Sequence, residues 1–457
     1  MSRLPPALLA SLEGLPGYDA DTFEKVHADG AQVTSIRLNP AKGEGRMPHF
    51  GGETKIPWSS WGYYLPARPS FVFDPLFHAG VYYVQEASSM SVEQAIRQTV
   101  DLSRPLRVLD LCGAPGGKST LLQSLLSPDS LLVSNEVIRN RVNILEENLV
   151  KWGAPNTIVT SNDPRDFQRL ENYFDVIVVD APCSGSGLFR REPDAIREWS
   201  VDNVQLCRGR QQRILTDCWP ALRKGGVLVY STCSFSREED EDILDWMMDN
   251  LDASSCRLNM DASWNIVETT GKNGGYGYRF YPDRLKGEGF FIGCMQKNDG
   301  GDFVRPRNKK AAPSAKLGKK EEETVSGWVR ADQPLFFFRH QEFIHALPGH
   351  LAEDLSLLQA ACYLKRAGVR MGKLAGDSLL PEHELALSTL INRELPGLSL
   401  SREQAVRYLR KEEILVDTHI RGWALAQYEG QNLGWMKVLP NRINNYYPKE
   451  WRILKRD

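Results

Sequence analysis

The sequence predicts an α/β protein with a Rossmann-like core, a small α+β domain before that core and α+β modules after it. Three observations support this fold class. Strand-like and helical patterns alternate through the middle of the chain, polar or glycine-rich loops follow several strands directly, and a basic stretch without periodicity comes next. Alternation of this kind is typical of βαβ crossovers, and therefore of a mostly parallel sheet.

The length and composition fit a protein of several domains. A chain of 457 residues exceeds one ordinary core, and its net charge of −2 requires any RNA-binding surface to come from local clustering. No apolar run could span a bilayer and no convincing signal peptide is present, so we expect a cytoplasmic protein without membrane contact. The eight cysteines form no Cys-x-x-Cys pair, and we therefore expect neither a metal site nor a disulfide framework.

The first unit is predicted to span residues 1–80, with a strand at Val33–Leu38, and the core to span 81–297. The core strands are expected at Leu106–Leu111, Leu131–Ser134, Thr157–Thr160, Phe174–Asp180 and Gly226–Ser231. The helices between them are expected at Ser119–Leu126, Arg141–Trp152, Asn203–Leu222 and Arg237–Asn250. Strand-like pieces at Trp264–Glu268 and Gly289–Gln296 could close the sheet, which would then be complete before residue 298.

The remainder of the chain is predicted to hold a basic linker at 298–325, an accessory α+β domain at 326–390 and a compact module at 391–457. The last module has 12 Lys and Arg against 8 Asp and Glu, a net charge of +4. Its aromatic residues are Trp423, Tyr428, Trp435, Tyr446, Tyr447 and Trp451. Cations and rings together suit nucleic acid, although aromatic residues are also frequent in cores.

A glycine-rich turn follows the first core strand, over Cys112, Gly113, Ala114, Pro115, Gly116, Gly117 and Lys118. It is one residue too short for a phosphate-binding P-loop and lacks the Gly-x-Gly-x-x-Gly dinucleotide pattern. Glu136 ends the second strand 20 residues after Gly116, where an acidic residue can accept from ribose hydroxyls, and Asp163 follows the third strand. Ribose and adenine contacts without a phosphate loop indicate S-adenosyl-L-methionine, although either carboxylate could instead cap a helix.

Two cysteine loops follow the fourth and fifth core strands. Cys183 lies in Asp180-Ala-Pro-Cys-Ser-Gly, and Cys233 lies in Ser-Thr-Cys-Ser. The carboxyl ends of parallel strands share one edge of a sheet, so the two thiols can face one substrate. A thiolate that adds to C6 of cytosine makes C5 nucleophilic, and a second thiol could assist elimination. Asp180, with Lys118 nearby, could act at the N3 edge of the ring.

These motifs, in this order, resemble the Nol1/Nop2/Sun family of RNA cytosine-5 methyltransferases. The resemblance covers residues 80–297 and implies a class I S-adenosylmethionine-dependent methyltransferase core that opens with Tyr82–Met90. It implies that Cys233 is the nucleophile and that Cys183 helps to release the product. It also implies cofactor contacts from the turn Cys112–Lys118 and from Glu136, Arg141, Asp163 and Asp180.

A weaker similarity places the chain in the bacterial F-type small-subunit rRNA branch. It is carried by Gly422-Trp-Ala-Leu and Leu433-Gly-Trp-Met-Lys, which resemble a PUA-like RNA-binding module. The implied partner is ribosomal RNA or the small ribosomal subunit, bound by a monomer. A tRNA cytosine-5 methyltransferase and a non-catalytic RNA-binding assembly factor are the alternatives. The second would have no need of paired thiols.

Overall fold

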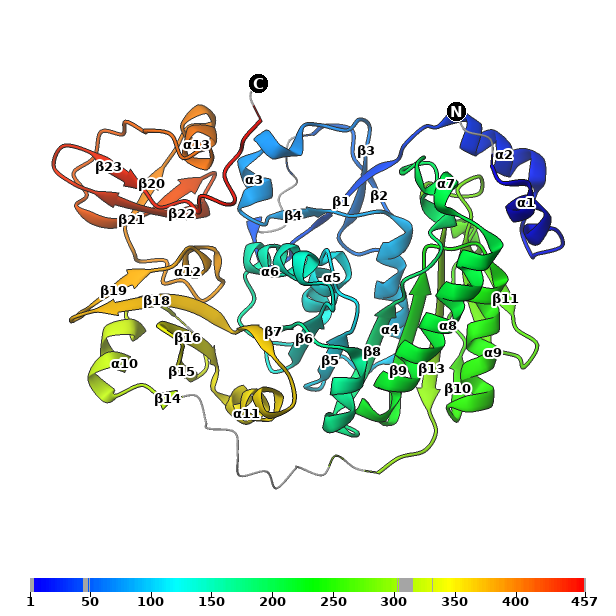
Figure 1. Cartoon of the computed structure of the whole chain (residues 1–457). Coiled ribbons are helices and arrows are strands. Elements are labelled where there is room, and N and C mark those ends of the chain that lie inside the picture. The colour runs from blue at the N-terminus through cyan, green and yellow to red at the C-terminus, as the bar shows by residue number, and fades with distance from the viewer. Residues whose placement is uncertain are drawn as a thin grey trace.

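The computed structural model describes residues 4–43, 48, 50–301, 303, 315–330 and 332–455. A ten-stranded sheet runs through the centre of the molecule (Figure 1). Its strands are β5 (Arg107–Asp110), β6 (Leu131–Asn135), β7 (Thr157–Thr160), β8 (Phe174–Asp180), β9 (Leu222–Thr232), β10 (Ala253–Cys256), β11 (Val267–Thr270), β12 (Tyr276–Phe280), β13 (Phe290–Lys297) and β17 (Leu364–Ala367). Their order is β11-β12-β13-β9-β8-β5-β6-β7-β17, and β10 pairs with β13.

The five strands predicted for the core form the parallel part of this sheet, in the order β7-β6-β5-β8-β9. The strand order reverses at β5, which lies between β6 and β8. In open α/β sheets, ligands bind outside the carboxyl ends of the strands at this kind of reversal. The predicted Rossmann-like fold class is therefore confirmed, and the topology identifies the edge at which to look for a site.

Helices cover both faces of the sheet. They are α4 (Val92–Thr99), α5 (Gly117–Leu125), α6 (Arg139–Trp152), α8 (Val201–Cys218), α9 (Glu241–Asn250) and α11 (Ala352–Ala361). The short helix α7 (Ala195–Glu198) packs instead near α1 (Pro6–Leu12) and α2 (Ala20–Asp29). Neighbouring strand residues point to opposite faces: Val108 packs with α4 and α5, whereas Leu109 packs with α8, α9 and α11. Across the described ranges, no helix is long and apolar enough to cross a membrane.

The N-terminal unit is an antiparallel sheet with three helices. They are α1 (Pro6–Leu12), α2 (Ala20–Asp29), β1 (Thr34–Leu38), β2 (Thr54–Lys55), β3 (Gly62–Leu65), α3 (Pro75–His78) and β4 (Tyr82–Val84), with strand order β2-β3-β1-β4. The predicted boundary at residue 80 cuts through this sheet, because Ile36 of β1 pairs with Val84 of β4. Tyr82–Val84 therefore completes the N-terminal sheet and does not open the core.

The C-terminal half holds two further sheets. The first comprises β14 (Ala315–Lys316), β15 (Leu335–His340), β16 (Phe343–Pro348), β18 (Val369–Ala375) and β19 (Ser378–Pro381), with α10 (Lys319–Ser326) and α12 (His383–Leu387). The second comprises β20 (Gly397–Ser399), β21 (Gly422–Tyr428), β22 (Gln431–Val438) and β23 (Ile443–Asn445), with α13 (Arg402–Leu409). Of the predicted linker, residues 302 and 304–314 lie outside the described residues, and the end of that stretch is helical as α10.

The sheet is not complete before residue 298, contrary to the sequence-based expectation. Strand β17 comes from the C-terminal half and pairs antiparallel with β7, Leu364 opposite Thr160. The buried side chain of Arg366 fastens this strand, since its Nη1 donates to Thr157 Oγ1 at 2.7 Å and its Nε lies 2.5 Å from Glu384 Oε1. The strand predicted at Trp264–Glu268 instead begins at Val267, after a 3-10 turn. The C-terminal half is thus part of the central core.

Candidate active site

The two cysteine loops bring their thiols face to face at the carboxyl edge of the sheet. Cys183 follows β8 and Cys233 follows β9, and their sulfurs lie 3.2 Å apart. Both side chains are half-buried and neither is in a disulfide. The hydrogen bond with Cys233, together with burial, raises the pKa of the Cys183 thiol well above its ordinary value. Cys183 is therefore held as a thiol that can donate to the Cys233 sulfur.

A lysine–carboxylate pair joins the start of α5 to the end of β8. Lys118 Nζ, at the start of α5, lies 2.7 Å from Asp180 Oδ2 at the end of β8. The other oxygen of Asp180 accepts from Ser231 Oγ at 2.9 Å. Burial opposes the charge on Lys118, but the attraction of Asp180, the hydrogen bond to it and the charge of Asp110 together outweigh burial and raise the pKa of the lysine. The side chain of Lys118 is only 13% exposed, whereas that of Asp180 is 33% exposed, so the carboxylate remains accessible to a bound molecule.

The glycine-rich turn is hydrogen-bonded to helix α6. Arg141 Nη2 donates to the carbonyl of Ala114 and Asn148 Nδ2 donates to that of Pro115, both at 2.8 Å. The Ala114–Pro115 peptide bond is cis. Gly116 caps α5 with φ of +113°, a conformation that side-chain-bearing residues rarely adopt. The turn can therefore bring its backbone close to a ligand.

The two predicted acidic contacts differ in their surroundings. Glu136 is buried at the end of β6, where Oε1 accepts from the backbone N–H of Ile138 and Oε2 lies 3.4 Å from Arg141 Nη1. Arg141 thus links Glu136 to the glycine-rich turn. Asp163 instead caps a 3-10 helix (Pro164–Leu170) and pairs with Arg213 of α8 at 3.4 Å. The side chain of Asp163 remains 30% exposed, so its carboxylate can still accept a hydrogen bond from a ligand while it caps the helix.

The aspartate before the turn has an unused acceptor. Asp110 is fully buried, and its Oδ2 accepts from Ser119 Oγ at 2.6 Å. Its Oδ1 is also buried and has no hydrogen-bond partner among the described residues. Burial raises the pKa of Asp110 to about 7. The neighbouring Cys112 is half-buried, and burial raises the pKa of its thiol as well. A donor from a bound ligand would satisfy Asp110 Oδ1.

Two polar residues at this edge were missed in the sequence. Ser231 precedes the Cys233 loop and donates to Asp180. Glu239 follows the same loop, is fully buried and accepts hydrogen bonds from Ser184 and Ser234. The acidic run from Glu238 to Asp242, shortly after a thiol loop, was the available signal. Such runs usually form solvated surfaces, so the pattern did not indicate a buried carboxylate.

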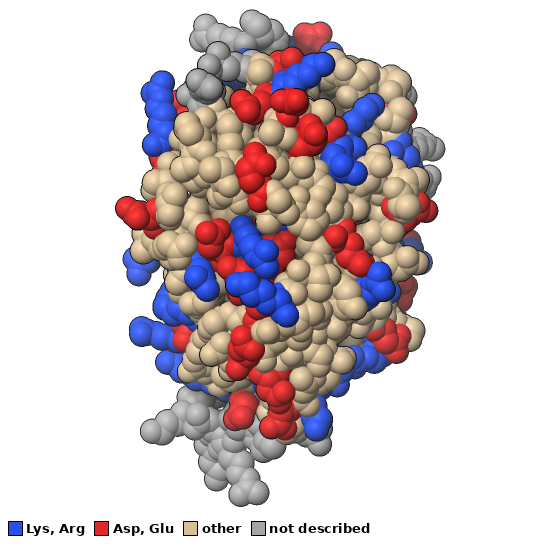
Figure 2. Space-filling model, turned by 90° about the vertical axis from the view of Figure 1, so that its right-hand side faces the viewer, with Lys and Arg blue, Asp and Glu red and all other residues tan. Residues whose placement is uncertain are grey.

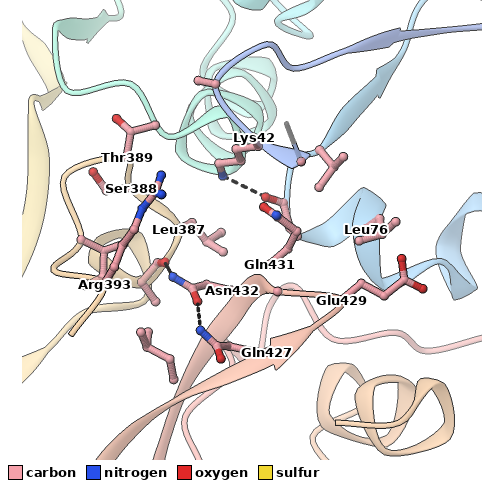
Figure 3. Close-up of a pocket in the computed structure, with 18 residues that line it drawn as sticks. Lys42, Leu76, Leu387, Ser388, Thr389, Arg393, Gln427, Glu429, Gln431 and Asn432 are labelled. Carbon is pink, nitrogen blue, oxygen red and sulfur yellow. Dashed lines mark hydrogen bonds between the residues drawn. The ribbon is translucent and has the colours of Figure 1, made fainter. Parts of the chain in front are cut away.

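A separate cavity of about 720 Å³ lies between the N-terminal unit and the C-terminal sheets (Figure 3). Its lining includes Lys42, Leu76, Ser388, Arg393, Gln427 and Asn432. None of its lining residues is a predicted site residue, and Gln427 Nε2 already donates to Asn432 Oδ1 at 2.9 Å (Figure 3). Figure 2 shows the face over α1, α2 and α9, where charges of both signs are interspersed.

The C-terminal aromatic residues fall into two groups. Trp435 and Tyr447 are each 1% exposed and belong to the core. Tyr446 is 39% exposed, and its ring centroid lies 4.5 Å from that of half-buried Trp423, over which Lys437 Nζ stands at 5.3 Å. An exposed ring beside a cation can stack on a nucleic-acid base.

Three segments match described protein families. Residues 98–296 match the 16S rRNA methyltransferase RsmB/F, residues 4–87 match the N-terminal domain of the 16S rRNA methyltransferase RsmF, and residues 396–453 match the methyltransferase RsmF PUA domain. The chain belongs to the RsmB/F family of 16S rRNA methyltransferases. In every described segment, no group of three or more His, Cys, Asp or Glu residues could hold a metal ion.

Relatives and solved structures agree with this family. Ribosomal RNA small subunit methyltransferase F of Cronobacter sakazakii is 28% identical over 468 residues, covering 98% of this chain and 96% of the relative. The enzyme of the same name from Shewanella loihica is 28% identical and covers 86% and 83%. A methyltransferase homologue from Pyrococcus horikoshii is 30% identical with a TM-score of 0.52, covering 64% of this chain and 100% of that one.

Membership of the RsmB/F family confirms the family predicted from the motifs and, with it, the cofactor S-adenosyl-L-methionine. The predicted PUA-like module is confirmed by the match to residues 396–453. The match to residues 4–87 agrees with an N-terminal unit that includes β4. The roles of individual site residues, the monomeric state and the cytoplasmic location stay predictions.

Proposed function

We propose that this chain methylates C5 of a cytosine in small-subunit rRNA through a covalent adduct between Cys233 and C6 of the base. The observation that carries the proposal is the pair of facing thiols, 3.2 Å apart, beside the Lys118–Asp180 pair at the carboxyl edge of a methyltransferase sheet. The names of the relatives support rRNA as the substrate. The chemistry of two adjacent thiols supports the covalent route.

The residues at the strand ends fit S-adenosyl-L-methionine. Asp110 Oδ1 is a buried acceptor without a partner among the residues that the structure describes, and the cofactor carries an ammonium group and two ribose hydroxyls that can donate. We assign cofactor contacts to the turn Cys112–Lys118 and to Glu136, Arg141, Asp163 and Asp180. When bound, the cofactor supplies an electrophilic methyl group. Arg141 holds both the turn and Glu136, so it acts on the cofactor site through these two neighbours.

The first step of the proposed reaction activates the base. The Cys233 thiolate forms a bond to C6, and the electron pair of the C5–C6 double bond moves toward C5 and the N3 edge of the ring. Lys118 can donate a hydrogen bond to that edge, and Asp180 can accept one from the exocyclic amine. Burial of the Lys118 side chain, which is 13% exposed, strengthens its interaction with the ring. C5 thereby becomes a nucleophile.

The last step of the proposed reaction releases the product. The C5–H bond breaks and its proton passes to a base, while the electron pair restores the C5–C6 double bond and expels Cys233 as a thiolate. Cys183 aids this step because its thiol lies within hydrogen-bond distance of the departing sulfur. Loss of Cys183 should therefore affect release more than addition.

Single and double cysteine variants test these roles. With small-subunit rRNA and S-adenosyl-L-methionine, Cys233→Ala should abolish formation of 5-methylcytidine, as measured by mass spectrometry of nucleosides. Cys183→Ala should accumulate a covalent protein–RNA complex on a denaturing gel, and the double variant should not. Cys256→Ala, at a thiol in β10, is the matched control. Normal activity of Cys233→Ala, or methylation of tRNA instead of rRNA, would refute the corresponding part of the proposal.

A further inference from the structure

Glu239 lies between the two cysteine loops and is hydrogen-bonded to both. It ends a short 3-10 helix (Arg237–Glu239) just after the Cys233 loop, and its side chain is fully buried. Its Oε1 accepts from the backbone N–H of Ser184 at 2.8 Å and from Gln211 Nε2 at 3.3 Å. Its Oε2 accepts from the hydroxyls of Ser184 at 2.5 Å and Ser234 at 2.6 Å.

These contacts reach the residues next to both thiols. Ser184 directly follows Cys183, and Ser234 directly follows Cys233. One carboxylate therefore sets the relative position of two cysteines that are 50 residues apart in the chain. Within the described part of the chain Glu239 forms no ion pair, so these hydrogen bonds must compensate the cost of burying its carboxyl group.

The loops would stay near each other without Glu239. The backbone N–H of Gly187 donates to the carbonyl of Cys233 at 2.8 Å, and that of Phe235 donates to Ser186 Oγ at 2.9 Å. Neither bond involves a residue adjacent to Cys183, but Ser184 Oγ also lies 3.3 Å from Ser234 Oγ. Glu239 adds shorter hydrogen bonds to both of these hydroxyls and one to the backbone N–H of Ser184. The specific contribution of Glu239 is thus to orient the two short segments that carry the sulfurs.

We propose that Glu239 is a positioning residue that holds the Cys183 and Cys233 thiols in register, so that both act on the same base. This inference rests on the proposed function for its catalytic consequence, although the alignment of the sulfurs can be measured without any methyl transfer. The negative charge of Glu239 also contributes to the raised pKa of Cys183, after the hydrogen bond with Cys233 and burial. Displacing one sulfur by about 1 Å can cost about 100-fold in rate.

Oxidation of the two thiols by diamide measures their alignment directly. The two thiols lose two protons and two electrons, a sulfur–sulfur bond forms, and diamide is reduced to the hydrazine. In the full-length protein, Glu239→Ala should slow formation of the Cys183–Cys233 disulfide at least tenfold, as followed by mass spectrometry of peptides. Ser234→Ala, which removes one arm of the contact, should slow it several-fold, whereas Glu239→Gln should restore much of the rate. Glu238→Ala is the matched control and should oxidise like the wild type.

Methyl transfer in a single turnover supplies the second measurement. Glu239→Ala should lower its rate by about 100-fold and Glu239→Gln by less than tenfold. If folded Glu239→Ala forms the Cys183–Cys233 disulfide at the wild-type rate, the proposal is overturned. If Glu239→Ala fails to fold, wild-type rates of disulfide formation and of methyl transfer in Ser234→Ala would overturn it. If the wild type forms no 5-methylcytidine, the proposed function fails, yet the oxidation rates still test the positioning role.

Discussion

The carboxylate of Asp354 accepts a hydrogen bond from the hydroxyl of Tyr173 at 2.5 Å, across 181 residues of sequence. The same oxygen lies 2.6 Å from Arg107 Nε at the start of β5. Asp354 belongs to α11, whose Leu355 and Leu358 are buried with strand residues of the central sheet. The C-terminal half therefore stabilises the sheet that carries the thiols.

Removal of residues from 326 onward should destabilise the catalytic core. The cut would expose the apolar surface now covered by Phe338, Leu355 and Leu358, and would remove β17 from the edge of β7. We expect an aggregating protein or a large fall in Tm. A cut before residue 396, which removes the PUA domain and keeps β17, is the comparison and should keep more of the Tm. If the chain that ends at residue 325 has the Tm of the full chain, the C-terminal half does not stabilise the catalytic core.

The fold was predictable where it depends on local patterns. Each of the five parallel strands is a short apolar run followed by a polar or glycine-rich loop, and the carboxyl-end rule then placed both cysteines at one edge. β17 was not predictable, because its partner β7 precedes it by about 200 residues and no local pattern encodes that pairing. β12 was missed because its glycine and arginine interrupt the apolar pattern of Tyr276–Phe280.

The candidate site was predictable in its reacting groups and less so in its supports. Cys183, Cys233, Lys118 and Asp180 stand in short motifs whose chemistry is readable from residue type. Glu239 was missed because its function depends on burial between two loops, which a run of five acidic residues does not reveal. A positioning residue of this kind is recognised only when the structure of both loops is known.

Glu136→Ala should weaken binding of S-adenosyl-L-methionine by about 1.5–3 kcal/mol, the usual size for hydrogen bonds to a charged group. The variant also removes the partner of Arg141, which holds the glycine-rich turn. RNA affinity should barely change. Isothermal titration calorimetry with the cofactor measures the effect. Glu147→Ala, which removes a carboxylate from α6, is the control. Unchanged cofactor affinity would argue against the ribose-binding role.

Stability should fall in mild acid because His78 is buried as a neutral ring. Burial, with the charge of Lys151, lowers the pKa of His78 to about 4, against about 6.5 in an unfolded chain. Between these values the unfolded state binds more protons, so the free energy of unfolding decreases as the pH falls from about 6.5 to 4. The full effect of this one group is roughly 3 kcal/mol.

Urea denaturation at pH 7.5 and at pH 5 tests the role of His78. His78→Gln should reduce the loss of stability between the two pH values, because glutamine does not titrate. His419→Gln, at an exposed ring, should leave that loss unchanged. An equal loss in the wild type and in His78→Gln would mean that other groups account for the acid sensitivity.

Tyr446 and the basic residues near it should contribute to RNA affinity in different ways. The exposed ring of Tyr446 can stack on an unpaired base, so Tyr446→Ala should weaken binding of a small-subunit rRNA fragment by about 1–3 kcal/mol without changing its salt dependence.

Arg442 is exposed at the start of the segment that leads into β23, and a phosphate contact there releases counterions. Arg442→Gln should therefore reduce the slope of log affinity against log salt by about 1. Lys25→Gln removes an exposed charge on α2 in the N-terminal unit and should change neither quantity. Filter binding over a salt series measures both quantities, and identical curves for Tyr446→Ala, Arg442→Gln and the wild type would show that this part of the module does not contact the RNA.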